Sequence, residues 1–435
     1  MAEERNVPKY RELKSPATAQ IELTSNCNNL CRYCYNSFRG EKDYDNGLQL
    51  KDSLRIGKEI VDNEVFEVVL TGGEPLLRRD LLYPLAEYLS SENVDVKMNT
   101  NLTLIDKDDP KKIEDSGILS VFGSLPSFNE KNYNRITRTE RYRNAINGIE
   151  ILLKSGIPTG INMVVTKLNR EEVYETGKFL YELGIKSFCA TPASPCYFMP
   201  KEIELKREEV VKTLDDLLRL KDEFGMRVDV VEPLPRCIVE KNDRYEIFLR
   251  RDCAAGKLTA SISSKGDVSP CTHVQKSYGN LLKENLSQIW KRMSNWRNGT
   301  YVPEHCMPCK ELEICSLGCR EAAKIRKGSY TEPDPWVSGK VLTKNRQQEK
   351  DFELDEDTFL KVSERVKFRE EKEGYLVFCS DTHSVVYLNP PFFKLLIGLK
   401  RMGEFTINSI KKESSSENEF SNIVKFLKKR GLIIT

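Results

Sequence analysis

Short apolar stretches alternate with longer amphipathic ones from about residue 17 to residue 235. Six apolar stretches have the length and composition of buried strands, and they cover residues 19–23, 67–71, 94–98, 118–123, 159–166 and 187–191. The segments between them repeat their apolar positions every three to four residues, for example over 144–155 and 170–183. Strands that alternate with helices are joined by right-handed crossovers and lie parallel. The pattern therefore predicts an α/β domain over residues 1–235.

Two architectures fit six such units. A partial (β/α)6 TIM-like barrel would gather its functional residues at the carboxyl ends of the strands. An open, doubly wound sheet would place them where the strand order reverses. We expect the partial barrel, although periodicity alone does not separate the two.

The remaining chain divides by composition. Residues 236–340 hold seven cysteines and little periodicity, so bound metal is expected to organise their fold. Residues 341–357 are charged and polar, as in a linker. Residues 358–435 form a third unit of α+β type, with strands predicted at 365–368, 375–379 and 385–388 and helices starting near 391, 407 and 417.

The balance of charge excludes two classes of partner. Lys and Arg total 68 against 66 Asp and Glu, a net charge of +2. Such a chain has no field to attract nucleic acid or an anionic membrane. No apolar run is long enough to span a bilayer, and the first residues do not form a signal peptide. We expect a cytoplasmic protein, whose thirteen cysteines bind metal rather than form disulfides.

Three cysteines within eight residues form the densest chemical pattern of the chain. Cys27, Cys31 and Cys34 follow the first predicted strand with the spacing CxxxCxxC. Iron–sulfur clusters are held by cysteine thiolates, and a [4Fe–4S] cube normally takes four of them. Three ligands would leave one iron open for chemistry. A zinc loop and buried structural cysteines are the alternatives.

The cysteine triplet and a second motif together resemble the radical S-adenosylmethionine (SAM) superfamily. Tyr33 precedes the last cysteine, and the run Thr-Gly72-Gly73-Glu74-Pro follows the second predicted strand. The resemblance implies that the three cysteines hold a catalytic [4Fe–4S] cluster and that Tyr33 borders the cofactor. It further implies that Gly72, Gly73 and Glu74 bind the amino group of SAM, whose reductive cleavage gives a 5′-deoxyadenosyl radical.

Four further polar residues match positions that contact SAM in that superfamily. Asn101 ends the third predicted strand, Ser124 ends the fourth, and Arg138 and Asn162 are weaker candidates near the carboxylate and ribose. For each of them, capping of a strand end or ordinary surface polarity is the alternative.

A second set of cysteines resembles the SPASM extension of radical SAM enzymes. The ordered pattern C…GxxxxC…CxxCxxxxxCxxxC consists of Cys253, Cys271, Cys306, Cys309, Cys315 and Cys319. The resemblance implies one or two auxiliary [4Fe–4S] clusters. Cys253, Cys271 and Cys319 would ligate one and the other three cysteines the second. A zinc ribbon is the alternative, because CxxC pairs commonly bind zinc.

The SPASM pattern is incomplete in this chain. Relatives carry a further cysteine near an Asp-Pro-aromatic stretch, where this sequence has Val337. Cys237, His273 and His305 are nearby candidates for the missing ligands, since histidine can replace cysteine on an iron–sulfur cluster. Thr272 stands where sulfatase-maturing relatives carry an aspartate base, which argues against that activity.

The last unit resembles the PqqD-like fold, a small winged helix that recognises leader peptides. The resemblance implies that residues 358–435 bind a ribosomal precursor peptide, which would add a strand to the sheet edge. A DNA-binding winged helix is the alternative, with Lys425, Lys428, Lys429 and Arg430 contacting phosphates.

Together these motifs predict a radical SAM/SPASM oxidoreductase that modifies a ribosomal peptide by crosslinking, epimerisation or excision. An electron donor such as flavodoxin or ferredoxin would serve the cluster. A SPASM enzyme acting on a small molecule of the tetrapyrrole pathway is the second interpretation, and a zinc-stabilised DNA-binding regulator is the third. Cys189 and Cys196 flank the sixth strand end and are expected to be buried, as is Cys379.

Overall fold

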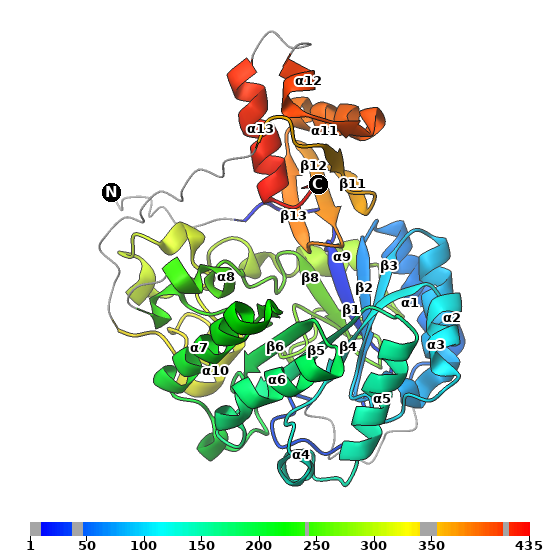
Figure 1. Ribbon diagram of the computed structural model, residues 1–435, viewed down its shortest axis with the longest axis vertical. Coiled ribbons are helices and arrows are strands. Elements are labelled where there is room, and N and C mark those ends of the chain that lie inside the picture. The colour runs from blue at the N-terminus through cyan, green and yellow to red at the C-terminus, as the bar shows by residue number, and fades with distance from the viewer. Residues whose placement is uncertain (1–9, 37–46, 240–242, 340–354, 412–416) are drawn as a thin grey trace. The chain divides into compact units, whose positions relative to one another are not determined.

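The computed structural model describes residues 10–36, 47–239, 243–339, 355–411 and 417–435 (Figure 1). The chain forms two compact units, Met1–Asn345 and Arg346–Thr435, and each is described by itself. Among the described residues, no helix has both the length and the apolar character that a membrane crossing requires.

The first unit is built on one nine-stranded sheet with the order β7-β6-β5-β4-β3-β2-β1-β8-β9. Strands β1 to β8 pair in parallel, and only β9 runs antiparallel to its neighbour. The strands are β1 (Thr18–Glu22), β2 (Glu67–Thr71), β3 (Asp95–Thr100), β4 (Ile118–Ser124), β5 (Thr159–Val165), β6 (Ser187–Pro192), β7 (Arg227–Asp229), β8 (Thr259–Ile262) and β9 (Val268–Ser269).

The strand order decides between the two expected architectures. From β1 to β7 each strand lies beside its predecessor in sequence, whereas a doubly wound sheet reverses its order at a switch point. The first unit is therefore an α/β fold with a sequentially ordered parallel sheet. All six predicted strands are present within two residues of their predicted ends. β7 was missed because it has three residues, two of them charged.

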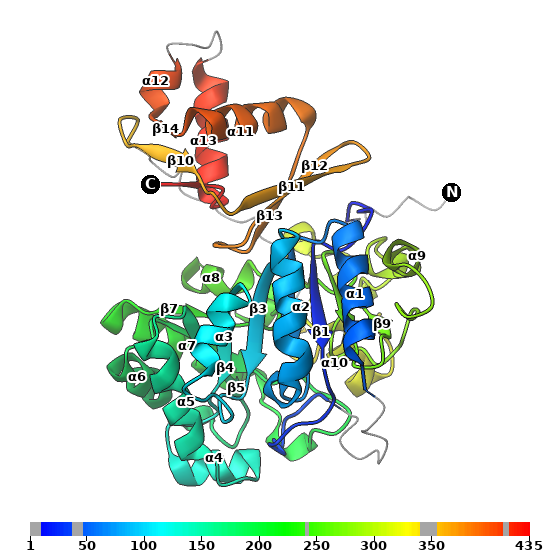
Figure 2. The ribbon, with the colours of Figure 1, turned by 90° about the vertical axis from the view of Figure 1, so that its right-hand side faces the viewer.

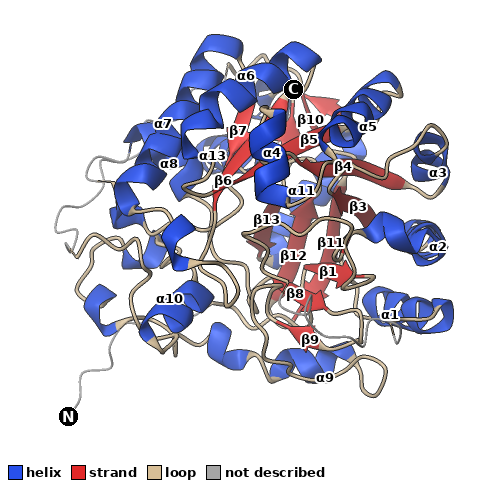
Figure 3. Ribbon diagram, turned by 90° about the horizontal axis from the view of Figure 1, so that it is seen from below, coloured by secondary structure: helices blue, strands red, loops and turns tan. Residues whose placement is uncertain are grey.

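Helices cover one face of the curved sheet, as Figures 2 and 3 show. They are α1 (Leu50–Asp62), α2 (Arg79–Ser91), α3 (Asp109–Asp115), α4 (Glu130–Thr137), α5 (Tyr142–Lys154), α6 (Val173–Leu183) and α7 (Arg207–Phe224), with short 3-10 turns η3 (Pro75–Arg78), η4 (Arg170–Glu172) and η5 (Lys201–Ile203). We call the helix-covered face the outer face and the opposite face the inner face.

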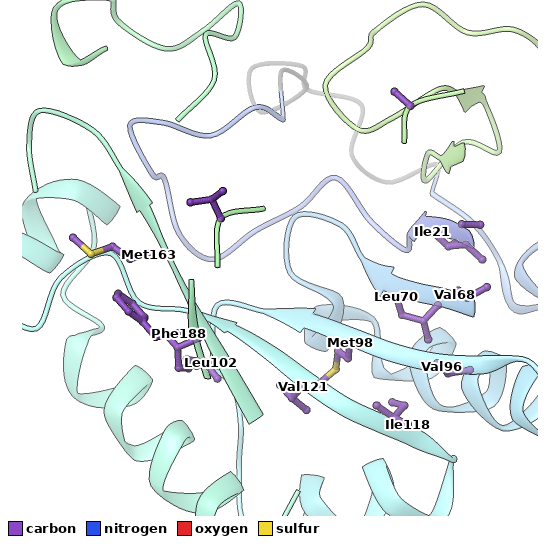
Figure 4. Packing of buried hydrophobic residues seen from close by; sticks show 14 of the residues in the cluster. Ile21, Val68, Leu70, Val96, Met98, Leu102, Ile118, Val121, Met163 and Phe188 are labelled. Atoms are coloured by element: carbon purple, nitrogen blue, oxygen red, sulfur yellow. The ribbon is translucent and has the colours of Figure 1, made fainter. Parts of the chain in front are cut away.

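Alternation along the strands separates the core from the inner face. Ile21, Val68, Val96 and Met163 are fully buried in the outer-face core, part of which is drawn in Figure 4. Because successive strand side chains point to opposite faces, the residues between them point inward. Many of these are polar, although parallel strands buried on both faces are normally apolar throughout. A polar inner face is expected where the sheet lines a binding site.

The cysteine-rich region continues the first unit. Its strands β8 and β9 extend the sheet beyond β1, and its other elements are short. They are η6 (Arg236–Ile238), η7 (Asp243–Tyr245), α8 (Glu246–Leu249), α9 (Leu286–Lys291), η8 (Ser294–Trp296), η9 (Glu304–Cys306), η10 (Leu312–Ile314) and α10 (Arg320–Lys327). The predicted domain boundary near residue 235 stays a prediction. Strands from both sides of it belong to one sheet, so the boundary marks where the cysteine-rich region begins rather than where the sheet ends.

The described residues of the second unit form two small sheets and three helices. Strands β11 (Val366–Glu371), β12 (Gly374–Cys379) and β13 (Ser384–Leu388) lie where the sequence predicted strands, and they pair as an antiparallel sheet. A second sheet pairs three strands that were missed because they have only two or three residues, β10 (Leu360–Val362), β14 (Glu404–Phe405) and β15 (Ile433–Ile434). The helices are α11 (Pro390–Met402), α12 (Ile407–Lys411) and α13 (Glu417–Lys429).

Candidate functional site

The loop that carries the cysteine triplet leaves the carboxyl end of β1 and packs on the loop after β2. Gly73 donates its N–H to the Thr24 carbonyl at 2.7 Å, and Glu74 donates to the Asn26 carbonyl at 2.8 Å. A Cβ on Gly72 would lie 2.4 Å from the Thr24 carbonyl oxygen, and one on Gly73 2.0 Å from that of Asn26. The two glycines are thus required by backbone packing, whatever they contribute to cofactor binding.

The middle of the same loop is held by the end of α4. Leu30 and Arg32 donate their N–H groups to the carbonyls of Thr137 and Ile136, at 2.9 and 3.1 Å. Arg138 follows as an exposed residue in the left-handed conformation that ends the helix. It lies on the segment that supports the cysteine loop.

Asn101 is the predicted site residue that contacts the triplet directly. Its Nδ2 lies 3.6 Å from the Cys27 Sγ and donates to the Asn28 Oδ1 at 2.8 Å. Its Oδ1 accepts from the Thr103 hydroxyl at 2.7 Å, which orients the amide. The Asn29 N–H also points at the Cys27 Sγ, at 3.4 Å. These donors fit a thiolate that carries charge as a cluster ligand.

Glu74 is fully buried and connects the ends of β2 and β3. Its carboxylate accepts from the Asn101 N–H at 2.7 Å, from the Thr100 hydroxyl at 2.8 Å and from the Leu76 N–H at 3.2 Å. Burial outweighs these hydrogen bonds and raises the pKa of Glu74 to about 7. A bound cation would lower that pKa again, so the carboxyl suits an ammonium group.

Ser124 and Asn162 are neighbours on the inner face, because β4 and β5 pair them in register. The Asn162 Oδ1 accepts from the Thr191 hydroxyl at 2.7 Å, which connects β5 to β6. Glu22 ends β1 beside Thr71. Because Ile21 points to the outer-face core and successive strand side chains alternate, the Glu22 side chain points to the inner face. Burial raises the pKa of Glu22 to about 7. Glu22 is thus a second buried carboxyl, after Glu74, whose pKa is raised to about 7.

Tyr33 packs against the loop that follows β6. It joins a small cluster with Ala193, Cys196 and Met199, and the Cys196 Sγ lies 3.5 Å from the Cys34 carbonyl oxygen. Burial raises the pKa of Tyr33 well above its usual value, and Cys31 adds to the effect. Cys189, Cys196 and Cys379 are buried, as predicted.

The predicted first auxiliary set lies together. Cys253, Cys271 and Cys319 influence one another electrostatically, and burial followed by Cys253 raises the pKa of Cys271 to about 12. Two other ligand types lie against Cys319, because ligand atoms of Glu232, His273 and Cys319 are all within 4.8 Å of one another. Cys319, the third cysteine of this set, thus has a carboxylate and an imidazole beside it.

Contacts connect this set to both the loop after β6 and the triplet. The Ser194 hydroxyl, in the loop after β6, donates to the Glu232 Oε1 at 2.6 Å. The ring of Tyr35, one residue after Cys34, lies 5.1 Å from the His273 ring between centroids. The triplet loop and the first auxiliary set therefore border the same region.

The predicted second auxiliary set surrounds a cavity. Cys306, Cys309 and Cys315 line a space of about 430 Å³ that is partly open to solvent, together with Cys237 and His305. Burial, then Cys315, and then Cys237 and Cys309, raise the pKa of the Cys306 thiol to about 11. Val337 lines the same cavity.

Only one of these ligand groups is as closely spaced as a single metal ion requires. Four ligands around a tetrahedral zinc at about 2.3 Å would lie about 3.8 Å apart. Within the described part of the chain, the group with all its ligand atoms within 4.8 Å is Glu232, His273 and Cys319, which contains a single thiol.

Three residues near the site escaped the sequence analysis. Glu232 follows β7 and Ser194 follows β6, and a polar residue at a strand end was the available signal. Asn28 had no signal, since it lies between two cysteines and its bond to Asn101 spans 73 positions.

Comparison with known families matches two segments of this chain. Residues 21–180 match the radical SAM superfamily, and residues 253–319 match the iron–sulfur cluster-binding SPASM domain. These segments contain all nine cysteines that the sequence analysis assigned to clusters.

Curated relatives extend the likeness to about three quarters of the chain. The chain is 26% identical to the AdoMet-dependent heme synthase of Methanosarcina barkeri over 356 residues, which cover 74% of this chain and 96% of the relative. It is 23% identical to the enzyme of that name from Nitratidesulfovibrio vulgaris, over 77% and 95% of the two chains. A probable GTP 3′,8-cyclase of Saccharolobus islandicus is 32% identical over 167 residues, 38% of this chain and 53% of the relative.

Solved structures share the fold. Streptococcus suis SuiB bound to S-adenosylmethionine superposes with a TM-score of 0.62 at 20% identity, over 77% of this chain and 79% of that one. The enzyme anSMEcpe with bound AdoMet gives 0.60 at 20% identity, over 74% and 91%. The two matched domains imply a [4Fe–4S] cluster, auxiliary clusters and SAM as cofactors. Domains, cofactors and fold together support a radical SAM/SPASM enzyme.

Proposed function

We propose that this chain oxidises a small molecule of the tetrapyrrole class at the inner face of its sheet. When bound at Cys27, Cys31 and Cys34, the cluster and SAM would supply a 5′-deoxyadenosyl radical that removes one hydrogen atom from the substrate, and an auxiliary cluster would accept the remaining electron, which completes the oxidation. The observation that carries the proposal is the contact of Tyr35 with His273. It brings the triplet loop and the auxiliary cysteines to one region, so that a substrate can meet both.

The described residues have separate tasks in this proposal. The Asn101 amide donates toward the Cys27 sulfur and stabilises its negative charge. The buried Glu74 carboxyl holds the ammonium group of SAM, and its three donors keep its orientation. Glu232, oriented by Ser194, faces the first auxiliary set and orients substrate there.

The relatives favour a small substrate over a peptide. Two AdoMet-dependent heme synthases align over 95% or more of their own length, and the aligned part corresponds in extent to the first unit of this chain. This chain has Thr272 where sulfatase-maturing relatives have an aspartate base. A hydroxyl does not act as a base at neutral pH, so this chain lacks that base.

The test begins with the cofactors. Anaerobically purified protein should be brown and contain roughly eight to twelve irons, counting four per cube over two or three clusters. With SAM and a reductant it should release 5′-deoxyadenosine, and an iron tetrapyrrole with carboxylate side chains should raise that release and be consumed. A colourless zinc protein would refute the enzyme, whereas SAM cleavage that ignores every tetrapyrrole would refute only the substrate class.

A ribosomal peptide is the second candidate substrate, and the second unit is the observation that favours it. Among the described residues, β13 is an end strand of the antiparallel sheet β11-β12-β13, so an extended peptide could add a strand beside it. Phe368 on β11 is about half exposed and packs on the Phe393 ring, so it offers a partial apolar contact on the same sheet.

The two candidates differ in what the second unit does. Deletion of residues 346–435 should leave tetrapyrrole turnover within about twofold if the substrate is small. For a peptide substrate, the same deletion should weaken peptide binding at least tenfold and spare uncoupled SAM cleavage. Reduced flavodoxin and ferredoxin can be compared with a chemical reductant in the same assay, because either is a proposed electron donor.

A further inference from the structure

The four cysteines around one cavity suggest a ligand that the SPASM pattern does not contain. We propose that Cys237 is the fourth protein ligand of the auxiliary cluster held by Cys306, Cys309 and Cys315. Its thiol would lose its proton to solvent on binding iron. The inference concerns the cofactor alone and is independent of the substrate.

Cys237 lines the same cavity as the three motif cysteines, although it lies 69 positions before Cys306 in the chain. No other cysteine lines this cavity among the residues that the structure describes. A four-iron cube normally takes four thiolates. The cavity therefore offers a complete set without a residue from the incomplete end of the motif.

Three contacts hold the Cys237 segment against the cysteine loop. The buried Ser316 hydroxyl donates to the Leu234 carbonyl at 2.8 Å. The Arg236 N–H donates to the Cys315 Sγ at 3.5 Å, and the Arg236 guanidinium pairs with Glu311 at 2.7 Å. All three contacts join residues 234–236 to residues 311–316, so the fold itself brings the two segments together.

The buried charge of Arg236 makes this approach specific. Arg236 is 1% exposed and also pairs with Glu246 at 2.7 Å. Removal of a partner from a buried ion pair is strongly destabilising, so the segment is expected to keep its position. Immediately after Arg236, the backbone turns through η6 and presents the Cys237 side chain to the cavity.

Val337 lines the same cavity as Cys237 but supplies no ligand. An aliphatic side chain cannot ligate iron. Cys237 and Val337 border one cavity, so in this proposal the fourth thiol comes from Cys237, which precedes the motif cysteines in the chain.

His305 is the competing ligand, because it lines the cavity as well. It directly precedes Cys306, so its placement follows from the motif and needs no separate support. Cys237, by contrast, is held in place by contacts between distant segments. A thiolate is also the usual ligand of a four-iron cube, whereas histidine is the exception.

The experiment isolates the auxiliary clusters by changing Cys27, Cys31 and Cys34 to alanine in the full chain. This parent should keep about eight irons, four per cube. Adding Cys237→Ala should lower the iron to between about four and seven, by loss of one cluster or of one iron from it. Mössbauer and EPR spectra should show the altered cluster, and circular dichroism should show a folded chain.

Two matched variants keep the result interpretable. His305→Ala should leave iron and spectra unchanged, and Val337→Cys combined with Cys237→Ala should restore the parent iron content, because both positions border the cavity. Cys237→Ala with unchanged iron and spectra would overturn the proposal, as would loss of the cluster in His305→Ala alone. A parent that binds no auxiliary iron would instead refute the auxiliary clusters themselves.

Discussion

Gly73 lies so close to Asn26 that no side chain fits between them: an added Cβ would come 2.0 Å from the Asn26 carbonyl oxygen. The loop after β2 and the loop that carries the cysteine triplet are thereby pressed backbone to backbone. The position of Cys27, the next residue after Asn26, depends on this contact.

Gly73→Ala should displace the cysteine loop. Overpacking against backbone costs about 1–3 kcal/mol, because neither partner is a flexible side chain. We expect a lower melting temperature of the apoprotein and loss of about four irons from the loaded protein. Gly398→Ala is the control, since nothing lies within 4 Å of its added Cβ and it sits within α11. Equal iron in both variants would contradict the steric argument.

Asn101→Leu should lower the reduction potential of the cluster at the triplet. The Asn101 Nδ2 lies 3.6 Å from the Cys27 Sγ, and donors near cluster sulfurs set the potential. Losing a donor destabilises the reduced, more negative state. Redox titration followed by EPR measures the shift. Thr103→Val should give a smaller shift, because it removes only the hydrogen bond that orients the Asn101 amide and leaves the donor itself in place; an equally large shift there would indicate a general disturbance of the loop.

Sequence periodicity predicted the strands well because each apolar run packs on the outer-face core. Glu67–Thr71 was predicted to the residue, since every position in it contributes to a buried strand. β7 and the short strands of the second unit depend on pairing with neighbours that are distant in sequence, and two or three residues carry no period.

The site could be predicted where its chemistry is local in sequence. The triplet and the Gly72–Glu74 run each lie within one loop, so their spacing could be compared with that of the radical SAM superfamily, and the resemblance implied their roles. Glu232 and Cys237 could not be assigned that way, because their partners lie about 40 to 90 positions away in the chain. The sequence named Cys237 as an available thiol but could not connect it to one of the two cysteine sets.

SAM binding should tighten as the pH rises from 6 to 8. Burial raises the pKa of Glu74 to about 7, so the carboxyl is neutral below that pH and attracts an ammonium group only above it. The sign for stability is opposite. The folded state without SAM holds a proton that the unfolded state releases above its lower pKa, so the free energy of unfolding falls between about pH 4.5 and 7.

Calorimetric titration of SAM at several pH values measures this dependence, and Glu74→Gln should flatten it. Glu22 provides the matched control, because burial raises its pKa to about 7 as well. Glu22→Gln should keep the pH dependence of the parent. A profile flattened by Glu22→Gln instead would move the ammonium contact to the end of β1.

Glu232→Gln should raise the reduction potential of the auxiliary cluster at Cys253, Cys271 and Cys319. Glu232 lies within 4.8 Å of Cys319 between ligand atoms, and a negative charge at that distance opposes the addition of an electron. For unit charges 4.8 Å apart at an effective dielectric constant of 20, the interaction is about 3.5 kcal/mol, which corresponds to roughly 150 mV for a one-electron couple. The variant lacking the triplet cysteines allows the auxiliary signal to be titrated by EPR without overlap.

Ser194→Ala is the control, because it removes the hydrogen bond to the Glu232 Oε1 while the charge remains. It should therefore move the potential by much less than Glu232→Gln, and a shift of equal size in the two variants would assign the effect to the orientation of Glu232 rather than to its charge.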